Sequence, residues 1–263
     1  MQQVNFDWEF IIADDYSTDG TREILQEYKN KFPDLIQLIL QPTNVGASKN
    51  WLQLLGAANN KYIAYMEGDD YWTDPLKLQK QVDFLEKNED YSLVFHKVKA
   101  LSNNQFIEED GIESRYLKIT DKDKITVIDL LKHNNFIHSC SILFRNSNLV
   151  FPFELSHSPV GDYFLFIILA QQGFLYRMDE YMGVYRRGSG NYSSLSRKEM
   201  QKKKLQYHMY ILSYLSKDEQ KLVFLESTLL QFDKYEELFM NERKNKLLGL
   251  KKIFNRFLKS TKK

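Results

Sequence analysis

The sequence predicts an α/β domain built on a central, mostly parallel sheet flanked by helices and followed by a helical C-terminal extension. Three observations predict this fold class. Between residues 8 and 87 an apolar strand, a polar loop and an amphipathic helix follow one another three times. Such repeats produce parallel strands joined by helical crossovers. Acidic residues follow the first and third strands, and from about residue 196 the composition becomes helical, with no proline.

The first repeat starts with the β-rich apolar run WEFII, residues 8–12, which leads into Asp14 and Asp15. A helix is predicted between about residue 20 and Pro33, because Ile24, Leu25 and Tyr28 recur at helical spacing. The candidate caps of this helix are Ser17, Thr18 and Asp19. The carboxylates therefore fall in the loop between strand and helix.

The second and third repeats follow the same plan. LIQLILQ (35–41) and YIAYM (62–66) are the predicted strands, and residues 46–60 form the helix between them. The helix after the third strand is predicted to begin near Pro75. Because the carboxyl ends of parallel strands share one edge of a sheet, the acidic residues after the first and third strands are expected to meet there, where such sheets bind ligands.

The later chain is less regular. Residues 103–124 are polar and loop-rich, TVIDLLKHN (126–134) is a predicted amphipathic helix, and HSCSILFR (138–145) and FLYRM (174–178) are predicted strands. The run GDYFLFIILAQQG, residues 161–173, predicts a buried helix opened by Asp162. We expect one domain over residues 1–195 and a helical extension over 196–263.

Composition limits the kinds of site and partner. Cys140 is the only cysteine, which excludes an internal disulfide and a cysteine-based metal site and suits a reducing compartment. Residues 243–263 hold nine basic groups and no acid, which leaves the rest with a net charge of −8. Nucleic-acid binding is disfavoured because that body would repel phosphate. We expect a cytoplasmic protein, at most peripheral on the inner face of a membrane.

The segment MEGDDYW, residues 66–72, places Glu67, Asp69 and Asp70 directly after a strand. Carboxylates crowded in this way are costly unless a cation or hydrogen-bond donors compensate them. Mg²⁺ and Mn²⁺ prefer such oxygen ligands, and Glu67 and Asp69 face the same side if the segment is extended. The alternative is that Asp69 and Asp70 merely cap the next helix.

Three segments together, FIIADDYSTDGTREIL, NVGASKNW and YIAYMEGDDYW, resemble the nucleotide-sugar-binding half of family 2 glycosyltransferases with the GT-A fold. The resemblance is close over residues 8–100 and looser to about 195. It implies that Asp14 and Asp15 contact the base and ribose of the donor, with Asn44, Gly46 and Lys49 completing the nucleotide pocket. It also implies a DXD-type metal site of Glu67, Asp69 and Asp70 that holds Mn²⁺ or Mg²⁺ on the donor diphosphate, with Asp69 itself touching the donor.

The resemblance further implies a catalytic carboxylate at the start of a later helix, and Asp162 occupies that place. It would take the proton from an acceptor hydroxyl, giving inversion; the alternative is a simple helix cap. In YRRGSGNYSS, residues 185–194, Arg186 or Arg187 would pair with phosphate oxygens from a mobile loop, although the histidine often found in this loop is absent. His96 and His138 are interpreted as structural.

The predicted function is transfer of a sugar, most simply from a UDP-sugar, to a saccharide or lipid-linked acceptor in cell-surface polysaccharide synthesis. One alternative is a truncated, non-catalytic binding module, because the usual first strand and helix precede the first motif in the family and are expected to be missing here. Another is a different metal-dependent phosphate-transfer enzyme. The basic amphipathic stretch 243–263 is expected either to contact an anionic membrane surface or to pack on the acidic body.

Overall fold

The computed structural model describes residues 2–107, 111–146, 149–188 and 195–260, with backbone alone at residue 238 and at 241–260. Its strands are β1 (Phe10–Asp14), β2 (Ile36–Leu40), β3 (Tyr62–Ala64), β4 (Tyr71–Trp72), β5 (Tyr91–Ser102), β6 (Gln105–Ile107), β7 (Leu143–Arg145) and β8 (Phe174–Arg187). Its helices are α1 (Thr21–Lys31), α2 (Ala47–Ala57), α3 (Lys77–Lys87), α4 (Gly111–Tyr116), α5 (Val127–His133), η1 (Ser139–Ser141), α6 (Phe153–His157), α7 (Gly161–Ala170), α8 (Arg197–Tyr214) and α9 (Asp218–Ser260). The three predicted strand-and-helix repeats are all present.

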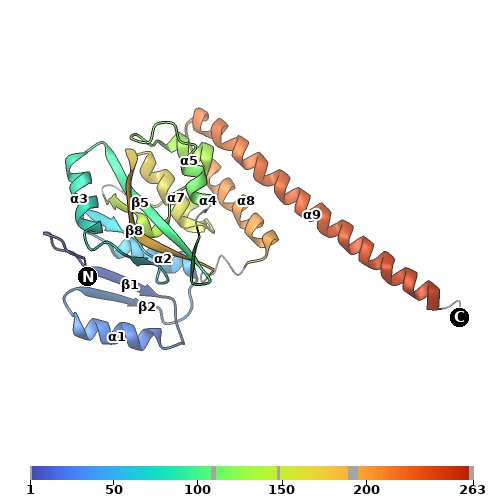
Figure 1. Ribbon diagram of the computed structural model, residues 1–263, viewed down its shortest axis with the longest axis horizontal. Coiled ribbons are helices and arrows are strands. Elements are labelled where there is room, and N and C mark those ends of the chain that lie inside the picture. Colours follow the sequence, from blue (N-terminus) through green and yellow to red (C-terminus); the bar gives the residue numbers. More distant parts are fainter. Residues whose placement is uncertain (1, 108–110, 147–148, 189–194, 261–263) are drawn as a thin grey trace.

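The strands form two sheets. A six-stranded sheet has the order β3-β7-β5-β8-β4, with β6 paired to β5, and the long strands β5 and β8 run through the middle of the body (Figure 1). A separate sheet pairs β1 with β2 in parallel and lies beside α1 at the edge of the molecule (Figure 1). Within the described part of the chain, no backbone ladder joins the two sheets.

Two details of the predicted sheet are wrong. The first three strands do not share one sheet, and β5–β8 is the only parallel pairing found in the described six-stranded sheet. The reason is a non-local insertion: β7 returns from residues 143–145 to pair antiparallel with both β3 and β5.

The buried helix predicted near Asp162 is confirmed as α7. Each residue from Tyr163 to Ala170 is buried, as expected for a helix that is apolar on all sides. Gly161 is its first residue, so Asp162 stands in the first turn. Side chains of α5, β5 and β7 share its hydrophobic core.

Several local predictions are corrected. Gly20, with φ +91°, is the N-cap of α1 in place of Ser17, Thr18 or Asp19, although Asp19 Oδ1 still accepts from the first-turn amide of Thr21 at 3.1 Å. The loop-rich region includes β6 and α4. The strand predicted at 138–145 is shorter, because its first half forms η1, and the strand predicted at 174–178 extends to Arg187.

The C-terminal helices begin on the body and then leave it. Ile211, Leu215 and Phe224 belong to the main hydrophobic core, and Thr228 of α9 is still buried against His208 of α8. The later part of α9 projects away from the domain (Figure 1). The projecting helix exposes apolar side chains, among them Leu229 and Phe239. Within the described residues, none of the helices combines the length and apolar character needed to cross a membrane.

Candidate active site

A tight turn gathers the three carboxylates of the MEGDDYW segment. The amide of Asp70 donates to the carbonyl of Glu67 at 3.2 Å, and ligand oxygens of Glu67, Asp69 and Asp70 all lie within 4.8 Å of one another. The extended geometry assumed from the sequence is therefore wrong, and the turn adds Asp70 to the pair. The capping alternative is also wrong, because α3 begins at Lys77 with Leu76 as its N-cap.

Asp70 is the buried member of this cluster, with 6% of its surface exposed. Its Oδ1 accepts from the backbone amide of Arg186 at 2.8 Å, while its Oδ2 is buried and has no hydrogen-bond partner among the described residues. Burial, only partly offset by the Arg186 amide, raises the pKa of Asp70 to about 6. A buried carboxylate oxygen without a donor is where a cation lowers the energy most.

Glu67 links this cluster to Asp162. Glu67 is exposed at the surface, but the surrounding protein partly desolvates its carboxylate. This desolvation and then the charges of Asp162, Asp70 and Asp69 raise the pKa of Glu67 to about 7. Burial also raises the pKa of Asp162, whose Oδ1 accepts from the amide of Tyr163 at 2.7 Å. Four carboxylates thus share one region of the molecule.

The residues present fit a hard divalent cation. Glu67, Asp69 and Asp70 offer only oxygen ligands, the preferred ligands of Mg²⁺ and Mn²⁺. The unsatisfied Oδ2 of Asp70 and the mutual repulsion that raises the Glu67 pKa are both relieved by such an ion. The other coordination positions would be left for substrate oxygens and water.

The end of β1 organises the second acidic pair. Asp14 is buried and its Oδ2 accepts from the amide of Ser17 at 3.0 Å and from Arg22 Nε at 2.6 Å. Asp15 accepts from the amides of Val45 at 2.7 Å and Gly46 at 3.0 Å. Asp14 thus fixes the loop after its own strand, and Asp15 fixes the loop before α2.

The other residues predicted to bind the nucleotide lie in the loop before α2, on α2 itself and at the end of β8. Asn44 Oδ1 accepts from the amide of Gly46 at 3.1 Å, and Gly46 has φ +88°, a conformation that favours glycine. Lys49 is exposed on α2. Arg186 and Arg187 end β8, with the Arg186 guanidinium 5.2 Å from the centre of the Tyr71 ring. Residues 189–194 of the predicted mobile loop lie outside the described residues.

Four site residues carry no signal in the sequence that could have found them. Tyr65 and Tyr185 have pKa values raised by burial and then by the Glu67 charge, that of Tyr185 to about 12. The His138 ring lies 5.0 Å from that of Tyr185 and helps to hold down the pKa of Asp70. The backbone oxygen of Cys140 accepts from Trp72 Nε1 at 2.8 Å, and burial and then the charge of Asp70 raise the pKa of the Cys140 thiol. Cys140 is buried as expected.

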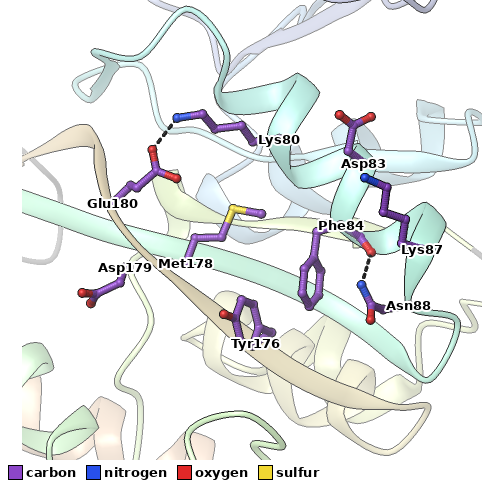
Figure 2. Close-up of a pocket in the computed structure, with 9 residues that line it drawn as sticks. All are labelled: Lys80, Asp83, Phe84, Lys87, Asn88, Tyr176, Met178, Asp179 and Glu180. Atoms are coloured by element: carbon purple, nitrogen blue, oxygen red, sulfur yellow. Dashed lines mark hydrogen bonds and ion pairs between the residues drawn. The ribbon is translucent and has the colours of Figure 1, made fainter.

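A further concavity of about 460 Å³ lies between α3 and β8 (Figure 2). Phe84 and Tyr176 stack there with ring centres 4.4 Å apart, and Lys80 pairs with Glu180 across it (Figure 2). None of the residues predicted from the sequence to form a site lines it. It is therefore distinct from the carboxylate cluster.

Comparisons with known proteins agree on one family and one fold. The family model described as Glycosyl transferase family 2 matches residues 2–149. An uncharacterized protein of Mycobacterium tuberculosis is 37% identical over 186 residues, which are 71% of this chain and 52% of that protein. The Escherichia coli UDP-Glc:alpha-D-GlcNAc-diphosphoundecaprenol beta-1,3-glucosyltransferase WfgD is 26% identical over 64% of this chain and 60% of its own. This chain spans about half the length of the mycobacterial relative.

Solved structures share the fold at low sequence identity. TarS of S. aureus, residues 1–349, has a TM-score of 0.59 and 17% identity over 88% of this chain and 65% of its own. The mannosyltransferase of Pyrobaculum calidifontis, in complex with GDP-Man and Mn²⁺, has a TM-score of 0.57 and 14% identity over 84% of this chain and 60% of its own. At these identities the likeness shows the fold alone.

Proposed function

The chain belongs to glycosyl transferase family 2 and has the GT-A fold, and on this premise we propose that it transfers a sugar with inversion. The donor is a nucleotide-diphosphate sugar, most simply a UDP-sugar, and the acceptor is a hydroxyl of a saccharide or lipid-linked saccharide in surface polysaccharide synthesis. One observation carries the proposal: a turn that gathers three carboxylates lies close enough to Asp162 for their charges to interact.

The nucleotide is proposed to lie between the end of β1 and the start of α2. Asp15 and Gly46 hold these two segments together, and Asp14 with Arg22 stiffens the first loop. We propose that Asp14 and Asp15 contact the base and ribose and that Asn44, Gly46 and Lys49 complete the nucleotide pocket. Arg186 and Arg187 are proposed to lie beside the diphosphate. The donor diphosphate then points toward the Glu67–Asp70 turn.

The metal ion is proposed to be held by Glu67, Asp69 and Asp70. When bound, it neutralises the diphosphate as that group departs. The mannosyltransferase of Pyrobaculum calidifontis is in complex with GDP-Man and Mn²⁺, which supports this assignment. Asp70, held by the Arg186 amide, also links the turn to the end of β8, so both segments are aligned before substrate arrives.

Asp162 is proposed to be the general base. Its carboxylate takes the proton from the acceptor hydroxyl, whose oxygen forms the new bond to the anomeric carbon while the bond from that carbon to the diphosphate oxygen breaks. Burial raises its pKa, which favours acceptance of the proton. The first turn of α7 fixes the position of this side chain.

The basic segment 243–263 is proposed to bring the protein to an anionic membrane surface from the cytoplasmic side. Nine basic groups within 21 residues support this proposal, and so does the lipid-linked acceptor in the name of the E. coli relative.

The experiment is a thermal-shift scan with UDP, GDP, dTDP and CMP, each with and without Mn²⁺, on the wild type and Asp69→Ala. A nucleotide at 100 times its dissociation constant adds about 2.7 kcal/mol of stability. We expect one nucleotide to stabilise the wild type only with metal, and Asp69→Ala to lose that effect. A folded chain that responds to none of them would contradict the proposal. Asp162→Asn should keep nucleotide binding while losing transfer. A non-catalytic binding module would instead show no transfer with either the wild type or the variant.

A further inference from the structure

The indole of Trp51 lies directly on the first residue of α7. A Cβ built on Gly161 would lie 2.5 Å from Trp51 Cζ3 and 2.9 Å from both Cε3 and Cη2. These two residues are 110 positions apart in the sequence and come from α2 and α7. Only a residue without a side chain allows this approach.

The backbone conformation at residue 161 does not require a glycine. Gly161 is absent from the glycines of positive φ in the described chain, so its backbone angles are open to any residue. A glycine in the first turn of a helix also costs stability relative to alanine. What Gly161 provides is room for the indole, immediately before Asp162.

Trp51 also reaches the carboxylate cluster through a second ring. Its indole packs edge-on against Tyr65, with ring centres 6.4 Å apart and planes at 82°. Burial and then the charges of Glu67 and Asp162 raise the pKa of Tyr65. Tyr65 therefore lies within electrostatic reach of both the cluster and Asp162, with Trp51 packed behind it and over Gly161.

We propose that Trp51 is a positioning residue for Asp162. By packing on Gly161 and against Tyr65, its indole sets where the first turn of α7 begins relative to the Glu67–Asp70 turn, and so sets the distance from the base to the bound donor. This inference rests on the proposed role of Asp162. It adds that the Trp51 side chain couples the nucleotide-binding segment around α2 to the base on α7.

The test is a double-mutant cycle on the full chain with Trp51→Ala and Gly161→Ala. Sugar transfer from UDP-glucose with Mn²⁺ to a synthetic α-GlcNAc diphospholipid is compared with hydrolysis of the same donor by the same preparation. The ratio of the two rates does not depend on the fraction folded. A base displaced by about 1 Å is expected to lower transfer about 100-fold, with UDP affinity within about twofold of the wild type.

The double-mutant cycle also predicts that the effects of the two substitutions are not additive, a result that general destabilisation would not produce. Gly161→Ala should lower the ratio of transfer to hydrolysis strongly in the wild-type background, where the added methyl group meets the indole. The same substitution should lower that ratio little when Trp51→Ala has removed the ring. Trp8→Ala is the matched control, because Trp8 packs edge-on against Phe10 at 5.1 Å, away from α7. It should leave the ratio unchanged.

Amide exchange provides a readout without substrate. The Tyr163 amide donates to Asp162 Oδ1 at 2.7 Å, and we expect Trp51→Ala to speed its exchange at least tenfold while Trp8→Ala does not. Unchanged exchange, or equal costs of Gly161→Ala in both backgrounds, would overturn the inference. A wild type that binds no nucleotide would instead overturn the proposed function, and the exchange measurement would still decide whether Trp51 holds this turn.

Discussion

Asp70→Asn should stabilise the metal-free protein at neutral pH while weakening the site. Asp70 is almost fully buried, and one of its oxygens has no hydrogen bond within the described structure. Its pKa is raised from 3.8 to about 6, so the folded state prefers the protonated carboxyl. Asparagine keeps the acceptor for the Arg186 amide and removes the charge.

The size of the effect follows from the pKa shift. A shift of about two units corresponds to about 3 kcal/mol. Because the folded-state pKa is the higher one, the folded protein binds the extra proton, and the stability owed to Asp70 falls as pH rises from about 4 to about 6. The variant and wild type should therefore be equally stable near pH 4, and the variant should gain about 3 kcal/mol by pH 7, about 6–12 °C in Tm.

Urea unfolding of both proteins between pH 4 and pH 8, first in EDTA and then with Mn²⁺ and UDP, measures this difference. Asp14→Asn is the control of opposite sign: burial there is outweighed by the Ser17 hydrogen bonds and the Arg22 ion pair, so the pKa of Asp14 is lowered. That variant should lose stability at pH 7, and the loss should disappear at acid pH. If Asp70→Asn is no more stable than the wild type at pH 7 without metal, the argument from burial is refuted.

Three further changes have defined outcomes. Asp162→Asn should lower the transfer rate about 10²–10⁴-fold with UDP affinity unchanged by calorimetry; parallel loss of affinity would contradict a separate base. Asp15→Ala removes the acceptor of the Val45 and Gly46 amides and should weaken UDP binding about tenfold. An unchanged Kd for UDP would contradict a role of this loop in nucleotide binding. Burial lowers the pKa of Lys77 to about 7, so Lys77→Met should raise the urea midpoint most at pH 6 and least near pH 10; a pH-independent difference would exclude a buried charge.

The parts of the site that depend on local order could be predicted from the sequence. The acidic residues at the ends of β1 and β3 follow apolar runs directly, and Asp162 precedes an unbroken apolar helix. In both cases the apolar run and the acidic residue beside it are close neighbours in the sequence, so the pattern can be recognised without knowledge of the tertiary structure. The same is true of α1, α2 and α3, whose apolar positions recur at helical spacing.

The parts that depend on non-local pairing could not be predicted. Nothing in HSCSILFR indicates that β7 inserts between β3 and β5, and this insertion brings Cys140 and His138 to Asp70. The turn at Glu67 replaced an assumed extended segment, because turn geometry depends on what packs beneath it. The approach of Trp51 to Gly161 joins two helices that the sequence does not relate.

The division of the strands into two sheets affects how the protein opens. The β1–α1–β2 unit is tied to the rest by side chains, such as Asn50 of α2 donating to the Ala13 carbonyl at 3.2 Å and Asn60 donating to Glu9 at 2.6 Å. No backbone ladder joins this unit to the other sheet in the part of the chain that the structure describes. A unit of this kind separates at lower free energy than the global unfolding, as an independent cooperative segment. This unit carries Asp14 and Asp15. A ligand that touches both this unit and the Glu67–Asp70 turn would therefore make the two parts unfold as one.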